Sequence, residues 1–198
     1  MSGADILAFA FVATLLVMSP GPNGVLIAKT VPTSGRLAGF ANVAGFVAAF
    51  ILHGAFSILG ISVLLMKSAV AFTIVKYLGA AYLIWIGVKS LIGVFRDQNT
   101  ASDVKPARRQ RTLVKAFAEG FLTNALNPKV TMFYLAAFPQ FISVAEGAVS
   151  AAILLVVIHA LINTVWFAAM VLLMARLTKM ASGGGFQRWL KGVTGVVF

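Results

Sequence analysis

Two long stretches of this chain carry almost no ionisable side chains, and they limit the folds that it can adopt. Residues 37–66 contain only His53, and residues 148–175 contain only His159. A membrane-spanning helix needs about 20 mostly apolar residues, so each stretch is long enough to cross a bilayer. The 198 residues are 60% hydrophobic and 11% charged, with a mean hydropathy of +0.96. A water-soluble domain of this size cannot bury so much apolar surface, so we expect an integral membrane protein.

The hydrophobic pattern predicts an all-α protein with about six membrane segments. The expected segments are residues 6–31, 39–66, 72–95, 113–138 and 148–175, followed by an apolar stretch that ends at Phe198. Prolines interrupt the first segment at residues 19–22 and the fourth at residues 127–129. The final stretch is too short to span a bilayer. We expect the sequence to stop inside a sixth helix; the alternative is a segment that only enters the membrane.

Basic residues predict the orientation. They give the chain a net charge of +11 and gather in connectors at residues 29–36, 96–115 and 176–191. Because these connectors are two spans apart, they lie on one side of the membrane, which the positive-inside rule makes cytoplasmic. The N-terminus is then outside, and Asp5 without a basic region before it argues against a cleaved signal peptide. The same rule explains the positive charge, so we expect no nucleic-acid partner.

An internal similarity predicts two inverted halves. Pro20 and Pro128 interrupt spans one and four at an offset of 108 residues, and His53 and His159 lie in spans two and five at an offset of 106. The halves are residues 1–95 and 113–198, joined by a basic linker at 96–112. Three spans is an odd number, so the second half inserts upside down, a pattern common in transporters. Chance coincidence of these residues is the alternative.

The interrupted helices indicate how a polar solute could be held. A proline inside a helix removes one N–H donor and frees the carbonyl four residues earlier. Pro20 and Pro22 would free the carbonyls of Leu16 and Met18, and Pro128 would free that of Asn124. Helix N-termini at such breaks favour anions, and free carbonyls accept hydrogen bonds from cations. Two crossed breaks therefore suit an amino acid, with ordinary proline kinks as the alternative.

Polar side chains extend this prediction. On a continuous helix, Asn124, Asn127 and Thr131 share one face with Gly120. Lys129 lies beside them, deep in an apolar segment, where an ionisable group is a functional candidate and snorkelling is the alternative. Residue His53 lies on a stripe of small residues in the second span, a pattern equally typical of a packing seam.

Missing residue types exclude several functions. The chain has no cysteine, and its acidic residues fall near the ends of the predicted spans or outside them. We therefore expect no metal site and no cofactor. The sequence has no catalytic motif, so we do not expect an enzyme. If transport is coupled to protons, the carriers within the spans are His53 and His159.

Three sequence motifs resemble those of the LysE/RhtB family of amino-acid exporters. They are Ser19-Pro20-Gly21-Pro22-Asn23, the stretch from Lys76 to Leu83, and the stretch from Gly120 to Phe141 that contains Asn127-Pro128-Lys129. The resemblance covers essentially the whole chain. It implies a carrier of the bacterial inner membrane that exports amino acids or close derivatives, driven by the proton gradient. The spans lack acidic residues for a cationic side chain, so the chain resembles the threonine, homoserine and leucine branch.

We therefore predict a secondary transporter that works by alternating access. The expected substrate-binding residues are Pro20, Gly21, Pro22, Asn23, Tyr82, Asn124, Asn127, Pro128 and Lys129, and the expected proton carriers are His53 and His159. The substrate carboxylate would meet the helix N-termini and Lys129, and its ammonium would meet the freed carbonyls. Aromatic residues such as Tyr82 and Phe133 would line an apolar pocket or add a cation–π contact. An exporter of another solute, a passive channel and a membrane scaffold remain alternatives, and the oligomeric state, including a homo-oligomer, is left open.

Overall fold

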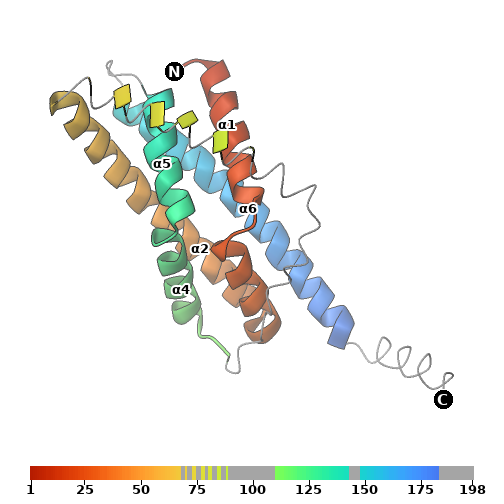
Figure 1. Cartoon of the computed structure of the whole chain (residues 1–198). Helices are drawn as coiled ribbons and strands as arrows, with labels where there is room; N and C mark the ends of the chain where they lie inside the picture. The colour runs from red at the N-terminus through yellow and green to blue at the C-terminus, as the bar shows by residue number, and fades with distance from the viewer. Residues whose placement is uncertain are drawn as a thin grey trace.

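The computed structural model describes residues 1–67, 110–142 and 148–182, together with scattered helical positions between residues 70 and 88. Within this part of the chain the regular elements are α-helices (Figure 1). They are α1 (Gly3–Met18), α2 (Pro22–Lys67), α4 (Leu113–Ala125), α5 (Pro128–Phe141) and α6 (Ala148–Ser182). Most of the expected third span and of the basic linker, and the final apolar stretch, lie outside the described residues.

Helix α2 is two helical segments joined by a reversal at Gly35. This glycine has φ 80° and ψ 174°, a backbone conformation that only glycine adopts readily. Residues 31 and 39 would lie about 12 Å apart along a straight helix. Instead, a Cβ atom on Gly39 would lie 2.7 Å from Cγ2 of Val31. The segment before Gly35 therefore completes the expected first span, and the segment after it forms the second.

The two interrupted spans run in opposite directions. Helix α1 and the first segment of α2 run from the end of the molecule that carries the N-terminus toward the opposite end (Figure 1). Helices α4 and α5 run the other way beside them, and α6 then returns across the molecule. Both interruptions occur at the prolines identified in the sequence, between Met18 and Pro22 and between Ala125 and Pro128.

Helices α2 and α4 approach each other through two glycines. A Cβ atom on Gly45 would lie 2.2 Å from the carbonyl oxygen of Phe117, and one on Gly120 would lie 2.3 Å from that of Asn42. Nδ2 of Asn42 donates a hydrogen bond of 2.6 Å to the carbonyl of Ala116 across the same contact. Small residues thus bring the two backbones together, and this contact fixes α4 beside α2.

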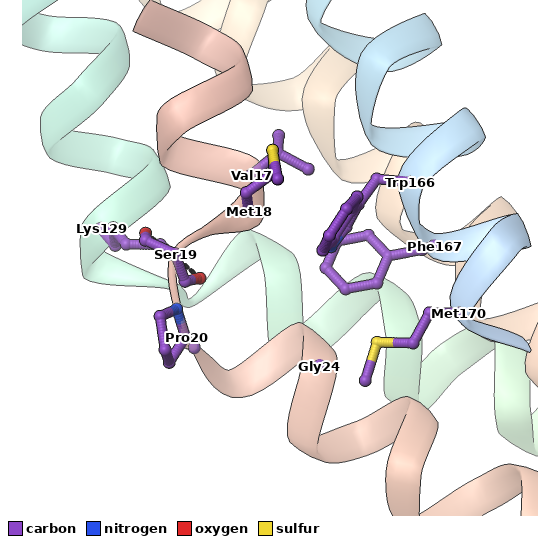
Figure 2. Close-up of a pocket in the computed structure, with 10 residues that line it drawn as sticks. Val17, Met18, Ser19, Pro20, Gly24, Lys129, Trp166, Phe167 and Met170 are labelled. Carbon is purple, nitrogen blue, oxygen red and sulfur yellow. Dashed lines mark hydrogen bonds between the residues drawn. The ribbon is translucent and has the colours of Figure 1, made fainter. Parts of the chain in front are cut away.

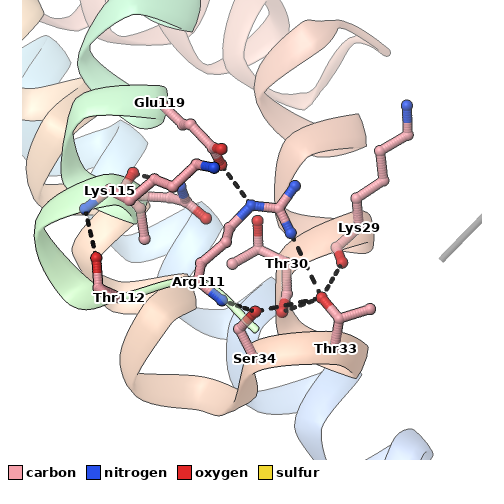
Figure 3. A network of polar contacts seen from close by, with 10 residues as sticks. Lys29, Thr30, Thr33, Ser34, Arg111, Thr112, Lys115 and Glu119 are labelled. Atoms are coloured by element: carbon pink, nitrogen blue, oxygen red, sulfur yellow. Dashed lines mark hydrogen bonds and ion pairs between the residues drawn. The ribbon is translucent and has the colours of Figure 1, made fainter. Parts of the chain in front are cut away.

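A polar network ties the Gly35 reversal to the start of α4 (Figure 3). The backbone N–H of Arg111 donates to Oγ of Ser34 at 2.9 Å, and its guanidinium donates to Oγ1 of Thr33 at 3.4 Å and forms an ion pair with Glu119. The network thus links the two interrupted spans at the end of the molecule opposite the N-terminus (Figure 1).

The outer surface of the helices suits a bilayer. Stretch Pro22–Gly60, which contains the Gly35 reversal, and stretch Val149–Met180 each include 18 residues apolar enough to cross a membrane, with mean hydropathies of 2.0 and 2.2. Such stretches also occur in core helices of soluble proteins. Here, however, large apolar side chains on α1 and α6 are exposed, among them Leu7, Phe11, Leu161 and Val165. Contiguous exposed apolar surface of this kind is typical of contact with lipid.

Candidate binding site at the two helix breaks

The first break leaves backbone carbonyls at the end of α1. Ser19 is the C-cap residue in an extended conformation, and its N–H donates to the carbonyl of Leu15 at 3.1 Å. Pro20 has no N–H to offer the carbonyl of Leu16. Oγ of Ser19 donates to that carbonyl instead, at 2.8 Å. The end of α1 is therefore a cluster of acceptors carrying the negative end of the helix dipole.

At the second break, an asparagine caps the N-terminus of the helix that follows. Asn127 is the N-cap of α5, and its Oδ1 accepts a hydrogen bond of 3.1 Å from the N–H of Lys129. The carbonyl of Asn124, which Pro128 leaves without a helical donor, accepts from the N–H of Asn127 and from Nε2 of His53, both at 3.1 Å. Because α4 ends before Asn127, this residue caps α5, and the expected polar stripe from Gly120 to Thr131 does not continue across the break.

Lys129 connects the second break to the first (Figure 2). Its Nζ donates to the carbonyls of Leu16 and Ser19 at 3.0 Å each and to Oγ of Ser19 at 2.9 Å. An ammonium group has three donors, and all three are used here. The Lys129 head group therefore occupies the acceptor cluster that the sequence analysis assigned to the substrate ammonium.

Buried amides join the breaks on a second path. Nδ2 of Asn23, in the first turn of α2, donates to Oδ1 of Asn124 at 2.9 Å. Asn124 is fully buried, and its Nδ2 donates to the carbonyl of Phe46 at 2.9 Å. Oδ1 of Asn23 is buried without a partner among the described residues. Asn23 and Asn124, predicted as binding residues from separate motifs, are thus brought together.

A cavity of about 130 Å³ opens beside the first break. Its polar end is formed by Ser19 and Lys129, and its opposite wall by apolar side chains of α6 (Figure 2). The full lining is Val17, Met18, Ser19, Pro20, Gly21, Gly24, Lys129, Trp166, Phe167 and Met170. A cavity with one polar end and one apolar wall suits a small solute with a charged head and a short side chain.

The two histidines both stack against Tyr134, and neither lines this cavity. The ring of Tyr134 stacks with His53 at 5.6 Å and with His159 at 5.5 Å between centroids. Both ring nitrogens of His159 and the hydroxyl of Tyr134 are buried without a partner among the described residues. Phe50 and Phe133 enclose His159, at centroid distances of 4.3 and 5.1 Å. Buried polar groups of this kind usually bind water or another polar group.

The structure thus separates the predicted residues into three sets. Pro20, Gly21 and Lys129 line the cavity, while Pro22, Asn23, Asn124, Asn127 and Pro128 form or brace the two breaks. His53 reaches the second break, and His159 lies in the aromatic cluster. Phe133 belongs to that cluster and not to the cavity wall, and Tyr82 lies outside the described residues.

Sequence reasoning missed the apolar wall of the cavity. Trp166, Phe167 and Met170 lie in a helix that is apolar on every side, so no periodicity marks the face that turns toward the break. The one available signal is Trp166 itself, a large side chain with a polar N–H placed well inside a span. Ser19 belongs to the recognised motif, but its role as an acceptor becomes visible only with Lys129 beside it.

Helices with interruptions at depth, lined by polar groups and surrounded by apolar faces, define a membrane protein of the transporter class. Residues 14–198 match the family model described as LysE type translocator, and the chain belongs to this family.

Several relatives match over most of the chain. It is 33% identical to the uncharacterized membrane protein YrhP of Bacillus subtilis over 98% of this chain and 94% of the relative. It is 29% identical to the threonine efflux protein of Salmonella typhi, over 96% and 91% respectively. The leucine efflux protein of Klebsiella pneumoniae is 35% identical over 67% of this chain and 60% of its own length. No solved structure matches the chain significantly.

Proposed function

We propose that this protein exports neutral amino acids or close derivatives from the cytoplasm across the bacterial inner membrane. The observation that carries the proposal is the cavity at the first break, where Lys129 and Ser19 form a charged end opposite the apolar wall of Trp166. An amino acid has matching parts: a charged head group, which suits the charged end, and a side chain, which suits the apolar wall. Relatives named as efflux proteins for threonine and leucine support this substrate class.

Export would proceed by alternating access between two inverted halves, residues 1–95 and 113–198, with the N-terminus outside and the basic connectors in the cytoplasm. The opposite directions of the two interrupted spans support this arrangement (Figure 1). Rocking of one half against the other around a site at the breaks would expose the cavity to each side in turn.

Exchange with protons would drive the export. His53 and His159 are the carriers proposed from the sequence, and the contact of His53 with the Asn124 carbonyl supports a link between its protonation and the second break.

Efflux from preloaded cells tests the proposal. Cells expressing the protein are loaded with threonine, leucine or homoserine, and the loss of each is followed with and without a protonophore. We expect saturable export of at least one of them, which the protonophore abolishes and Lys129→Ala reduces at normal membrane levels. Lys115→Ala is the matched control, because Lys115 is exposed at the start of α4. Linear, protonophore-insensitive flux would instead indicate a channel, and no flux for any amino acid would refute the substrate class.

A further inference from the structure

The position of the Lys129 head group raises the question of how a substrate ammonium could reach the carbonyls at the end of α1. A lysine side chain and an amino acid both present a primary ammonium with three N–H donors. The carbonyls of Leu16 and Ser19, and Oγ of Ser19, already accept all three donors of Lys129. One acceptor cluster cannot hold two ammonium groups at the same time.

We propose that Lys129 is a tethered stand-in for the substrate, so that its ammonium and that of the transported amino acid occupy the α1 carbonyl cluster alternately. This inference rests on the proposed export function, and it assigns the exchanged proton to Lys129 instead of to His53 or His159. In the empty carrier, Lys129 fills the cluster and satisfies its carbonyls. When a substrate ammonium takes its place, Lys129 loses its acceptors and gives its proton to water on the side to which the site is open.

The surroundings of Lys129 favour loss of the proton after displacement. In the described part of the chain the ion pair is Arg111 with Glu119, and Lys129 has no carboxylate partner. With the substrate carboxylate at the helix N-termini and not at Lys129, the displaced ammonium has no acceptor once the site closes around the substrate. An ammonium without acceptors is costly inside a membrane, so the neutral amine is then the favoured form. The exchange balances: one substrate ammonium enters the cluster, and one proton leaves Nζ.

No other titratable group on the surrounding helices takes the place of Lys129 as the donor to the α1 carbonyl cluster, among the residues that the structure describes. Among the described residues they are Asp5 on α1, His53 on α2, Glu119 on α4, Tyr134 on α5 itself and His159 on α6. The remaining basic residues with described side chains are Lys29, Arg36, Lys115, Arg176 and Lys179 on these helices and Arg111 just before α4. None of these side chains is among the donors to the α1 carbonyl cluster, and Lys129 alone donates to both Leu16 and Ser19 from another helix.

The geometry also leaves room for the exchange. A Cβ atom on Gly21 would lie 3.0 Å from Nζ of Lys129, so the absence of a side chain there keeps space beside the ammonium. The cavity of about 130 Å³ adjoins the same atoms, which gives an arriving substrate a place next to the cluster before Lys129 leaves it. Both features belong to the first break, whereas the lysine is anchored to the second.

The test is substrate binding to the purified, full-length protein between about pH 5.5 and 7.5. In this range the α-ammonium of a free amino acid stays protonated, because its pKa lies above the value of about 8 that is usual for a chain N-terminus. The ligand is whichever of threonine, leucine or homoserine the wild type exports. One proton exchanged for one substrate predicts that the apparent Kd of the wild type falls by about tenfold per pH unit as the pH rises. Lys115→Met is the control and should keep this slope.

Two variants of Lys129 have opposite expected results. Lys129→Met, which removes the competitor, should bind at least as tightly as the wild type at pH 7.5, without dependence on pH. In proteoliposomes it should exchange labelled for unlabelled substrate but lose export driven by a pH gradient. Lys129→Arg, whose guanidinium keeps its charge, should hold the cluster permanently and bind poorly at every pH.

The outcomes separate this inference from the function on which it rests. If Lys129→Met is folded by size exclusion and circular dichroism but no longer binds substrate, or if it binds with the pH slope of the wild type, the stand-in role is wrong. A retained slope would assign the proton to another group such as His53 or His159, and export itself would still stand. If Lys129→Arg binds like the wild type, the inference also fails. Absence of amino-acid export by the wild type would refute the proposed function, and the inference with it.

Discussion

The close contact between α2 and α4 predicts that two glycine-to-alanine changes in α2 have different effects on stability. The comparison separates the cost of close packing from the gain in helix propensity. Gly45→Ala places a methyl group 2.2 Å from the carbonyl oxygen of Phe117. Ordinary contact begins at 3.4 Å, so the two backbones must separate by the difference, 3.4 minus 2.2, or 1.2 Å. Gly60→Ala in the same helix meets nothing within 4 Å and serves as the matched control.

The consequence of this separation can be followed through the hydrogen bonds that cross the contact. The bond from Asn42 to the carbonyl of Ala116 is 2.6 Å long, and that from Asn124 to the carbonyl of Phe46 is 2.9 Å. A shift of 1.2 Å directed along these bonds would lengthen both beyond hydrogen-bonding distance. Each such bond between membrane helices contributes about 0.6 to 1.5 kcal/mol.

Gly45→Ala should therefore lower the free energy of unfolding by about 1–3 kcal/mol for the lost bonds, partly offset by about 1 kcal/mol of helix propensity. Gly60→Ala should gain the propensity without the loss. Thermal unfolding of the purified protein in lipid nanodiscs measures both, and we expect Gly45→Ala to unfold several degrees below Gly60→Ala. Equal transition temperatures for the two variants would show that this contact yields without cost, and would refute the reasoning.

Three further changes test the cavity and the network. Gly21→Ala crowds Nζ of Lys129, from which its Cβ would lie 3.0 Å, so it should weaken export at normal membrane levels; Gly3→Ala, which meets nothing within 4 Å, should not. Trp166→Ala removes part of the apolar wall and makes room for a longer apolar side chain, so the ratio of leucine to threonine efflux should rise by about tenfold, the discrimination that one methylene gives in a hydrophobic pocket. An unchanged ratio would show that this wall does not contact the substrate. Glu119→Gln removes a partly exposed ion pair with Arg111 and should lower the free energy of unfolding in nanodiscs by about 1 kcal/mol. In a protein that already carries Arg111→Met, the same change should have no effect if the ion pair is the source of the loss.

The helix breaks were predictable because their cause is local. Pro20 and Pro128 remove backbone donors wherever the rest of the protein lies, so the interruptions and the freed carbonyls of Leu16 and Asn124 follow from the sequence. The apolar spans follow in the same way from composition, and their helical structure is confirmed for residues 3–67, except at the break and at Gly35, and for residues 113–125, 128–141 and 148–182.

The partners at the breaks depend on contacts between residues far apart in the sequence. Lys129 reaches Ser19 across 110 residues, and Asn23 reaches Asn124 across 101. A single sequence contains no periodicity that pairs such positions. The expectation of a polar stripe through Asn127 failed for a related reason, because face arithmetic holds only while a helix is continuous. The wall at Trp166 was missed because α6 is apolar on all sides.

The same long-range contact explains why the two breaks could act as one device. The acceptors at the first break belong to α1, and the cation that satisfies them is carried by the first turn of α5, which runs in the opposite direction (Figure 1). A motion of one interrupted span against the other therefore acts on the contact between Nζ of Lys129 and the carbonyl of Leu16. Such a motion must either carry the lysine with it or leave a charged group and bare carbonyls in the membrane interior. Under the proposed exchange, a substrate ammonium in place of the lysine would remove that cost, so the occupied site could move where the site with a displaced, charged lysine could not.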